Sequence, residues 1–284
     1  MDGSTFLIIG ANGQLGQALQ QKYPNAKAVD SAELDITNAE QIAAFDWSTI
    51  KTILNAAAYT NVDGAETPEG RVAAWQVNAL GVANLSKAAL RHNLTLVHIS
   101  TDYVYDGSLG VHTETEPFSP LGVYGQSKAA GDLAASLATS HYILRTSWVI
   151  GDGKNFVRTM LGLGEKGVAP TVVADQVGRP SFTTEIVRAI DHLLATQAPV
   201  GTYNVSNGGD PISWADFTRE IFKQAGYDLA VTDTTTAEYF AGKPGIAPRP
   251  LNSTFDLSKL ESTSFTFTDW REDLKRYIQE ERQQ

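Results

Sequence analysis

The glycine-rich loop near the N-terminus is the feature that most constrains the fold of this chain. Residues 10–16 read Gly-Ala-Asn-Gly-Gln-Leu-Gly, after an apolar stretch of strand length (residues 5–9) and before a stretch of helical spacing (residues 16–22). Side chains in place of the glycines would hold an anion away from the backbone amides and the helix N-terminus. The context predicts a dinucleotide pyrophosphate site, with a ligand-free turn as the alternative. The loop residues expected to contact this cofactor are Gly10, Asn12, Gly13, Gln14, Leu15 and Gly16.

Short β-branched stretches alternate with longer helical stretches through the first half of the chain. The expected strands are residues 5–9, 26–29, 52–54, 96–99 and 142–145, and the expected helices are residues 16–22, 39–45, 71–91 and 124–138. The strands are short and largely apolar, which is typical of strands buried on both faces of a parallel sheet. The alternation predicts an α/β fold with a doubly wound, Rossmann-type parallel sheet.

The pattern becomes less regular after Trp148. Loops containing glycine and proline are expected at residues 162–170 and 241–250, so a second, smaller region begins near residue 151. We expect residues 1–150 to form a dinucleotide-binding domain and residues 151–284 to form mainly a substrate-binding region. The expected helix at residues 183–194 and strand at residues 201–205 would return to the sheet, so segments near residues 181–206 would interleave the two regions.

The composition narrows the possible chemistry. The chain has no cysteine, which removes disulfides, thiolate metal sites and cysteine nucleophiles, and its five histidines lack metal-ligand spacing, so no metal site is predicted. A formal net charge of −10 disfavours binding to nucleic acid and to anionic membranes, although a local basic pocket would still accept a small polyanion. No apolar run is long enough to span a bilayer and no signal segment is evident, so we expect a cytoplasmic protein.

Asp30 ends the second expected strand, 20 residues after Gly10. An acidic residue at this distance usually meets the hydroxyls of the adenosine ribose, which favours NADH, and a turn or cap role is the alternative. The short Ser31 follows, and basic residues from elsewhere would be needed to hold a 2′-phosphate, so NADH and NADPH both stay open. Small residues follow the end of the next expected strand. They would leave room for a cofactor to lie across the strand ends, or they would allow a helix to pack closely. These cofactor candidates are Ala56, Ala57, Ala58 and Tyr59.

Tyr124 and Lys128 are the main catalytic candidates. Residues four apart share a helix face, so both side chains reach one site. A carbonyl that receives hydride needs a proton donor, and an ammonium near a tyrosine stabilises its phenolate and lowers its pKa. Alone, this pair is a frequent chance match, but Thr101 follows the expected strand at residues 96–99, where a hydroxyl faces the ligand crevice of an open sheet. A cap or turn is the alternative for Thr101. Asn78 is either the holder of a helix kink or a surface amide.

These segments together resemble the dTDP-4-dehydrorhamnose reductases of the extended short-chain dehydrogenase superfamily, whose glycine spacing this loop shares. The resemblance runs nearly end to end and is most specific at residues 100–107 and 120–128. Few positions depart from the family pattern: Arg179 and Ser181 stand where a smaller residue and a threonine are expected, and Tyr105 replaces a frequent phenylalanine. Other segments similar to family motifs are residues 55–60, 62–66, 145–148, 155–157, 175–180 and 249–253.

The resemblance implies reduction of the C4 ketone of dTDP-6-deoxy-L-lyxo-4-hexulose to dTDP-L-rhamnose with NADH or NADPH. Thr101, Tyr124 and Lys128 would be catalytic, and Lys128 would also hold the nicotinamide ribose. Residues that would contact the adenine are Asp35 and Ile36. Residues that would contact the sugar are Asp102, Tyr103 and Trp148, with a core position as the alternative for Trp148. Arg249 and Arg179 would pair with the diphosphate of the dTDP-linked substrate, with a surface or loop position as the alternative. Some family members dimerise, and some do so through a magnesium site built from glutamates; because Gln14 replaces one of these, no metal is predicted.

Two other functions stay open from the sequence. Another enzyme of nucleotide sugars, an epimerase or a dehydratase, would recycle its cofactor, but a dehydratase needs a second acid where Tyr103 follows Asp102. A non-catalytic, reductase-like regulatory subunit would keep the fold and bind a partner. The intact set of Thr101, Tyr124 and Lys128 disfavours this reading, although a motif alone does not establish turnover.

Overall fold

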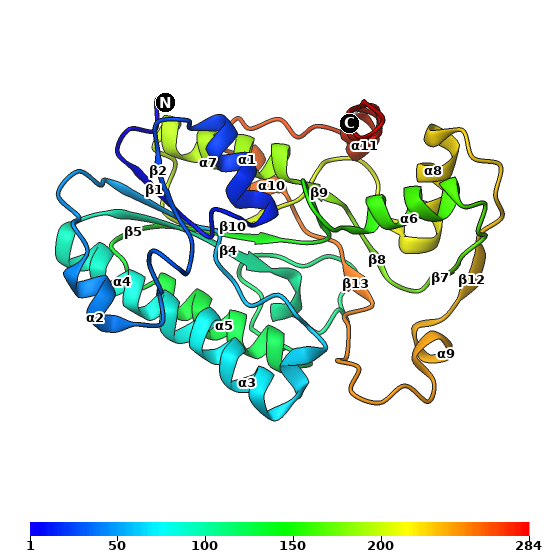
Figure 1. Cartoon of the computed structure of the whole chain (residues 1–284), viewed down its shortest axis with the longest axis horizontal. Coiled ribbons are helices and arrows are strands. Elements are labelled where there is room, and N and C mark those ends of the chain that lie inside the picture. Colours follow the sequence, from blue (N-terminus) through cyan, green and yellow to red (C-terminus); the bar gives the residue numbers. More distant parts are fainter. Residues whose placement is uncertain (284) are drawn as a thin grey trace.

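A parallel sheet of six strands forms the centre of the molecule, with the strand order β2-β1-β3-β4-β5-β10 (Figure 1). This computed structural model describes residues 1–283. All neighbouring strands in the sheet are parallel, so the predicted α/β, doubly wound fold class is confirmed. The strands are β1 (Phe6–Ile9), β2 (Lys27–Val29), β3 (Thr52–Asn55), β4 (Thr95–Thr101), β5 (Ser140–Thr146) and β10 (Gly201–Val205).

Helices cover both faces of this sheet (Figure 1). Successive residues of a strand point to opposite faces, so Phe6 and Ile8 of β1 pack into one apolar core while Leu7 and Ile9 pack into the other. On the first face lie α1 (Gln14–Lys22), α7 (Thr183–Thr196) and the short α10 (Ser258–Glu261). On the second face lie α2 (Ala39–Ala44), α3 (Pro68–Trp75), α4 (Val82–His92) and α5 (Val123–Ala135).

The C-terminal part of the chain packs around a third apolar core, at the right of Figure 1. Its small sheets have the strand orders β11-β8-β13, β12-β7 and β6-β9. The strands are β6 (Val149–Ile150), β7 (Thr171–Val173), β8 (Val177–Gly178), β9 (Ser181–Phe182), β11 (Ile212–Ser213), β12 (Thr232–Thr234) and β13 (Asn252–Ser253). The helices are α6 (Phe156–Glu165), α8 (Trp214–Ala225), α9 (Thr236–Phe240) and α11 (Trp270–Glu281). Within residues 1–283, no helix combines the length and apolar character that crossing a membrane requires.

The chain crosses between its two parts more than once. After β6 and α6, the segment α7–β10 returns to the main sheet, where β10 pairs in parallel with β5. The prediction of a loop at residues 162–170 is partly wrong, because α6 continues to Glu165. A Cβ on Gly164 would lie 2.3 Å from the Tyr227 ring, so this glycine allows close packing inside the helix and does not end it.

A π-helical turn interrupts the long helix expected at residues 71–91. It spans Gln76–Gly81, between α3 and α4, and carries Asn78 at its centre. Asn78 is buried; its carboxamide oxygen accepts from the Tyr59 amide (2.8 Å), and its Nδ2 donates to the Tyr59 carbonyl (3.1 Å) and to the Ser127 hydroxyl (3.0 Å). Asn78 therefore ties the kinked helix to the end of β3 and to α5, and the reading of a surface amide is wrong.

Replacing this amide should destabilise the fold. Asn78→Ala is expected to lower the free energy of unfolding by about 2–4 kcal/mol, because the three bonds are lost and buried partners stay unpaired. Urea denaturation followed by circular dichroism measures the change. Gln76→Ala, exposed on the same turn, is the matched control and should shift stability by less than about 0.5 kcal/mol. Equal effects of the two substitutions would contradict the assigned role of Asn78.

Candidate active site

A cavity of about 580 Å³ lies at the carboxyl ends of the central strands. This edge is where an open α/β sheet binds its ligands. The wall comes from the glycine-rich loop, the ends of β3, β4 and β5, the start of α5, and the segment at residues 148–154. A neighbouring pocket of about 330 Å³ is lined by the ends of β1, β2 and β3. Gly13, Ala56 and Ala58 line both spaces, so the two form one continuous groove across the strand ends.

The glycine-rich loop has the close backbone packing that its sequence predicts. Gly10 has a φ of +81°, and a Cβ there would lie 2.7 Å from the Ala57 amide nitrogen. A Cβ on Gly16 would lie 2.1 Å from the Gly10 carbonyl oxygen. Gly16 is buried and does not line the groove, so its role is to let α1 approach the loop. No side chain of residues 1–283 caps the first turn of α1, which leaves its amides free for an anion.

All the other expected cofactor-binding residues line the groove. One part of the groove contains Asn12, Gly13, Gln14, Leu15, Ala56, Ala58, Tyr124 and Lys128. The other contains Gly10, Gly13, Asp30, Asp35, Ile36, Ala56, Ala57, Ala58 and Tyr59.

Asp30 has a structural role as well as a place in the groove. Its carboxylate accepts hydrogen bonds from the amides of Asn12 (3.0 Å) and Ser31 (2.7 Å), and these bonds lower its pKa. Asp30 therefore stabilises the turn through these bonds and also lines the groove, so both interpretations of this residue apply. The Asp35 carboxylate is turned toward Thr37, whose amide and hydroxyl donate to it at 2.9 and 2.8 Å.

The structure brings the three catalytic candidates into one cavity. Tyr124 and Lys128 lie on the first turns of α5, and Thr101 ends β4 beside them. Lys128 is 2% exposed, and its Nζ donates to the Ile99 carbonyl at 2.5 Å. The Thr101 hydroxyl donates to the Asp102 carboxylate at 3.0 Å. A substrate carbonyl would therefore have to compete with Asp102 for the Thr101 proton.

Burial is the largest influence on the pKa values of Tyr124 and Lys128. It raises the pKa of Tyr124 to about 12, partly offset by the Thr101 hydroxyl. Burial also lowers the pKa of Lys128 to about 8, partly offset by the buried carboxylate of Asp132. The expected lowering of the Tyr124 pKa by Lys128 is therefore not found in the protein alone, because desolvation disfavours both charged forms and the carboxylates of Asp102 and Asp132 raise the Tyr124 pKa further. At neutral pH Tyr124 is a neutral phenol and Lys128 is mostly an ammonium.

Of the residues expected to contact the sugar, Asp102, Tyr103 and Trp148 line the cavity. Asp102 is buried and also accepts a hydrogen bond from Ser253 of β13, so its carboxylate is directed at protein groups. The Tyr103 ring meets the Tyr124 ring edge to face, with centroids 5.4 Å apart. Trp148 has a φ of +47° and stacks on Trp214, with centroids 3.6 Å apart. The Trp148 side chain is therefore packed against Trp214 and also lines the cavity.

The two arginines expected at the diphosphate do not line this cavity. Arg179 donates to the carbonyls of Gly209 (2.7 Å) and Phe255 (3.0 Å). Arg249 forms a forked ion pair with Asp63, at 2.9 and 3.0 Å. Arg249 thus joins loops of the two halves and Arg179 joins loops within the C-terminal part, roles that short motifs in the sequence do not reveal.

Part of the cavity wall is not predicted from the sequence, above all the segment at residues 152–154, which includes the cation Lys154. Its glycines and polar residues gave no periodic signal. Other missed wall residues are Gln17, Thr60, Val62, Ile99, Ser100, Thr146 and Val149.

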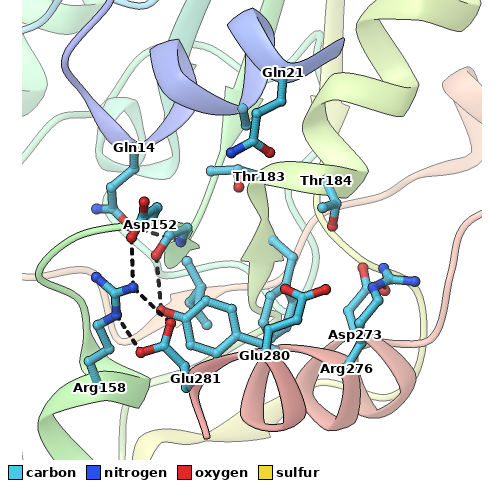
Figure 2. Close-up of a pocket in the computed structure, with 15 residues that line it drawn as sticks. Gln14, Gln21, Asp152, Arg158, Thr183, Thr184, Asp273, Arg276, Glu280 and Glu281 are labelled. Carbon is cyan, nitrogen blue, oxygen red and sulfur yellow. Dashed lines mark hydrogen bonds and ion pairs between the residues drawn. The ribbon is translucent and has the colours of Figure 1, made fainter. Parts of the chain in front are cut away.

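Helix α11 contacts residues on both sides of this segment, and Figure 2 shows Arg158 next to Glu281 at the end of this helix. The Tyr277 hydroxyl donates to the Gly151 carbonyl (3.0 Å) and accepts from Asn155 (2.7 Å), while Arg158 pairs with Glu281 at 2.6 Å. From the other side, the Gln14 carboxamide accepts from the Gly151 amide at 2.8 Å. Among residues 1–283, no group of three or more His, Cys, Asp or Glu side chains is placed to hold a metal.

Comparison with known proteins identifies the family. The model of the RmlD substrate binding domain matches residues 4–283. The chain belongs to this family. A relative named dTDP-4-dehydrorhamnose reductase, from Aggregatibacter actinomycetemcomitans, is 39% identical over 95% of this chain and 96% of its own. The spore coat polysaccharide biosynthesis protein SpsK of Bacillus subtilis is 34% identical over 96% of each chain.

Solved structures support the same placement in the RmlD family. The dTDP-4-dehydrorhamnose reductase of Bacillus anthracis, solved in complex with NADP, is 36% identical with a TM-score of 0.89, over 97% of this chain and 98% of its own. The structure of a dTDP-4-dehydrorhamnose reductase from Clostridium acetobutylicum is 38% identical to this chain with the same TM-score, over 96% of this chain and 98% of its own. The dehydratase DesIV of Streptomyces venezuelae is 21% identical with a TM-score of 0.79, over 98% and 97%, which shows a shared fold alone.

Proposed function

We propose that this chain reduces the C4 ketone of dTDP-6-deoxy-L-lyxo-4-hexulose to dTDP-L-rhamnose, with NADH or NADPH as reductant. The observation that carries the proposal is the meeting of Thr101, Tyr124 and Lys128 in one cavity that continues into the glycine-lined groove. Relatives named dTDP-4-dehydrorhamnose reductase, similar over nearly the whole chain, support this substrate.

The groove fits a nicotinamide dinucleotide. The uncapped start of α1 offers amides to a pyrophosphate, and Asp30 offers carboxylate oxygens to ribose hydroxyls. When bound, the cofactor supplies a hydride to the C4 carbon of the ketone. Lys128, deep in the cavity, would hold the nicotinamide ribose through its ammonium.

Tyr124 donates the proton in the proposed mechanism. Reduction leaves negative charge on the former carbonyl oxygen, and the phenol transfers its proton to that oxygen to give the alcohol. The phenolate left behind is stabilised by the Lys128 ammonium and regains its proton from solvent. The hydroxyl of Thr101 would leave Asp102 and donate to the carbonyl oxygen, which orients the ketone toward Tyr124.

The sugar would lie between α5 and the C-terminal part. Tyr103 and Trp148 would offer apolar surface to the hexose ring, and Asp102 would act by orienting Thr101. Arg179 and Arg249 are left out of this site, since both are engaged elsewhere, and Lys154 lines the cavity as a second cation besides Lys128. We further propose that residues 1–150, with residues 181–206, form the nucleotide-binding part, and that the rest of residues 151–284 forms mainly the substrate region.

Net consumption of the reductant separates this reaction from its rivals. A dTDP-4-keto sugar generated in situ should oxidise added NADH or NADPH and yield dTDP-L-rhamnose, identified by mass and NMR. An epimerase or dehydratase would convert the sugar without net oxidation. A regulatory subunit would bind nucleotide without turnover. Either result would overturn the proposal.

The membrane-impermeant substrates favour a cytoplasmic location.

Tyr124→Phe should abolish most turnover while cofactor affinity stays close to that of the wild type. The substitution deletes the proton donor and little else, so kcat should fall by about 10²–10⁴-fold. Turnover follows from reductant absorbance and affinity from calorimetry. Tyr239→Phe, at an exposed tyrosine, is the control and should change neither quantity. A Tyr124→Phe enzyme with wild-type kcat would refute the assignment.

The pH profile should report the charge of Lys128. Because burial lowers the Lys128 pKa to about 8, the ammonium is present below that pH and is lost above it. The kcat/KM for the cofactor, which reports the free enzyme, should therefore fall as the pH rises through about 8. In Lys128→Arg the guanidinium stays charged, so kcat/KM should no longer fall in this pH range, even if the rate is low. A level wild-type profile through this pH would contradict the role.

We also propose a homodimer formed through the outer faces of α3, the π-helical turn and α5. Val72, Leu80, Leu133 and Leu137 are 56%, 48%, 60% and 68% exposed there, and large exposed apolar side chains often mark an interface. Light scattering should give the mass of two chains. Leu133→Lys with Leu137→Lys should give one, whereas Val200→Lys, at a residue 50% exposed elsewhere, should not change the mass. A wild-type monomer would end the proposal.

A further inference from the structure

We infer that His98 is a positioning residue of this site, because its imidazole helps to keep the Asp132 carboxylate ionised, one helical turn from Lys128. The inference rests on the proposed reduction, in which the Lys128 ammonium holds the cofactor and stabilises the Tyr124 phenolate. It goes beyond that function by assigning a role to a buried group that the mechanism does not use. His98 does not line the cavity, and its contacts lie behind the cavity wall, between β3, β4 and α5.

The hydrogen bonds of Asn55, at the end of β3, fix which nitrogen of His98 carries the proton. The Asn55 carboxamide oxygen accepts from the Ala57 amide at 3.2 Å, so its Nδ2 is the group that lies 3.1 Å from His98 Nδ1. An amide NH2 group can only donate, and Nδ1 must therefore accept. Burial, together with the charge of Lys128, lowers the pKa of His98 well below its ordinary value. The ring is thus neutral, with its proton on Nε2.

The protonated Nε2 faces helix α5. A Cβ on Gly131 of α5 would lie 3.4 Å from this nitrogen, and Oδ1 of Asp132 lies 3.9 Å from it. Ser100 stands two residues after His98 on β4, so both side chains point to the same face of the sheet. This is the face that α5 covers, since Leu96 of the same strand packs into the core on that side with Ala135.

Three buried polar atoms of this cluster have no hydrogen-bond partner among residues 1–283: His98 Nε2, Ser100 Oγ and Asp132 Oδ1. Their residues are 0%, 3% and 2% exposed. The first two can donate and the third accepts, and the 3.9 Å between Nε2 and Oδ1 is too long for a direct hydrogen bond. We assign to this point one buried water, which accepts from Nε2 and donates to Oδ1.

The Asp132 carboxylate needs these donors to stay ionised. Burial raises its pKa, and Arg145 and the Ser100 hydroxyl partly offset this effect. The Arg145 Nε donates to Oδ2 at 2.9 Å, which leaves Oδ1 to the side of His98. Burial in turn lowers the pKa of Lys128, and the Asp132 charge partly offsets it. His98 therefore acts on Lys128 through Asp132, without contact with cofactor or substrate.

The other ionisable groups around this cluster come from α5, from β5 and from the chain after β4. They are Tyr124, Arg145, Asp102, and Tyr105, whose hydroxyl accepts from Arg145. Tyr124 and Asp102 line the cavity, and Arg145 is bonded to the other oxygen of Asp132. His98 is thus the ionisable group of β4 that meets Asp132 inside the protein.

Nuclear magnetic resonance tests the inference without relying on turnover. The ¹⁵N shifts of His98, assigned by comparison with His98→Gln, should show a neutral ring with its proton on Nε2 from about pH 6 to pH 9. The ¹³Cε shift of Lys128, assigned with Lys128→Arg, should titrate with a pKa of about 8. A proton on Nδ1 of His98 would overturn the inference.

His98→Gln and His98→Asn form a matched pair. Glutamine places a donor where Nε2 stands, whereas asparagine replaces only the acceptor Nδ1 and does not reach toward Asp132. Each loses one contact, so a merely structural role predicts the same Lys128 pKa in both. We expect His98→Asn to lower the Lys128 pKa by about half a unit or more, and His98→Gln to leave it close to the wild-type value.

Ser100→Ala removes the second donor at little cost in packing, and it should lower the Lys128 pKa in the same direction. It decides the test if thermal unfolding shows that His98→Asn does not fold. In the enzyme assay, the fall of kcat/KM for the cofactor should move to lower pH by the same amount as the Lys128 pKa.

The outcomes separate this inference from the proposed function. Equal Lys128 pKa values in the two His98 variants, or an unchanged value in Ser100→Ala, would overturn the inference and leave the reduction in place. A Lys128 pKa that shifts as expected, in a protein that does not reduce the sugar, would overturn the proposed reaction alone.

Discussion

The close approach of the glycine-rich loop to its surroundings is the constraint on which the rest of the site depends. Gly10 lies against Ala57 at the end of β3, and Gly16 lies against the Gly10 carbonyl, at distances that exclude a side chain. This packing brings the start of α1 to the strand ends and leaves its amides uncapped. Asp30 completes the arrangement from β2 by accepting from the Asn12 amide. These contacts thus place the uncapped start of α1 and the carboxylate of Asp30 side by side in the groove.

A second set of contacts, in the interior, holds Lys128, the lysine of the proposed mechanism. Lys128 reaches the Ile99 carbonyl from within the core, where removal from water disfavours its charge. One turn later on α5, the buried Asp132 pairs with Arg145 of β5 at 2.9 Å. A lone buried charge would be costly, and this paired carboxylate offsets part of the penalty on Lys128. The protonation of Lys128 therefore depends on the pair of Asp132 and Arg145, which does not line the cavity.

The C-terminal part closes the cavity through contacts that run far along the chain. Trp148 stacks on Trp214, Ser253 reaches Asp102, and α11 holds the segment behind the glycine-rich loop through Tyr277. Each of these contacts joins a wall residue, or the chain next to one, to an element at least 60 residues away in the sequence. The substrate side of the cavity thus depends on the packing of both parts of the chain.

The sequence by itself determined the α/β fold, the glycine-rich loop and the sharing of one helix face by Tyr124 and Lys128. These features follow from local rules: the period of apolar residues, the backbone freedom of glycine and the helical repeat. Only the tertiary structure decided that Arg249 pairs with Asp63 while Lys154 reaches the cavity, and that Asn78 is buried at a π-helical turn. It also decided that burial raises the pKa of Tyr124, whereas the sequence predicted that Lys128 would lower it. Side-chain partners and desolvation depend on residues distant in the chain, which no local pattern encodes.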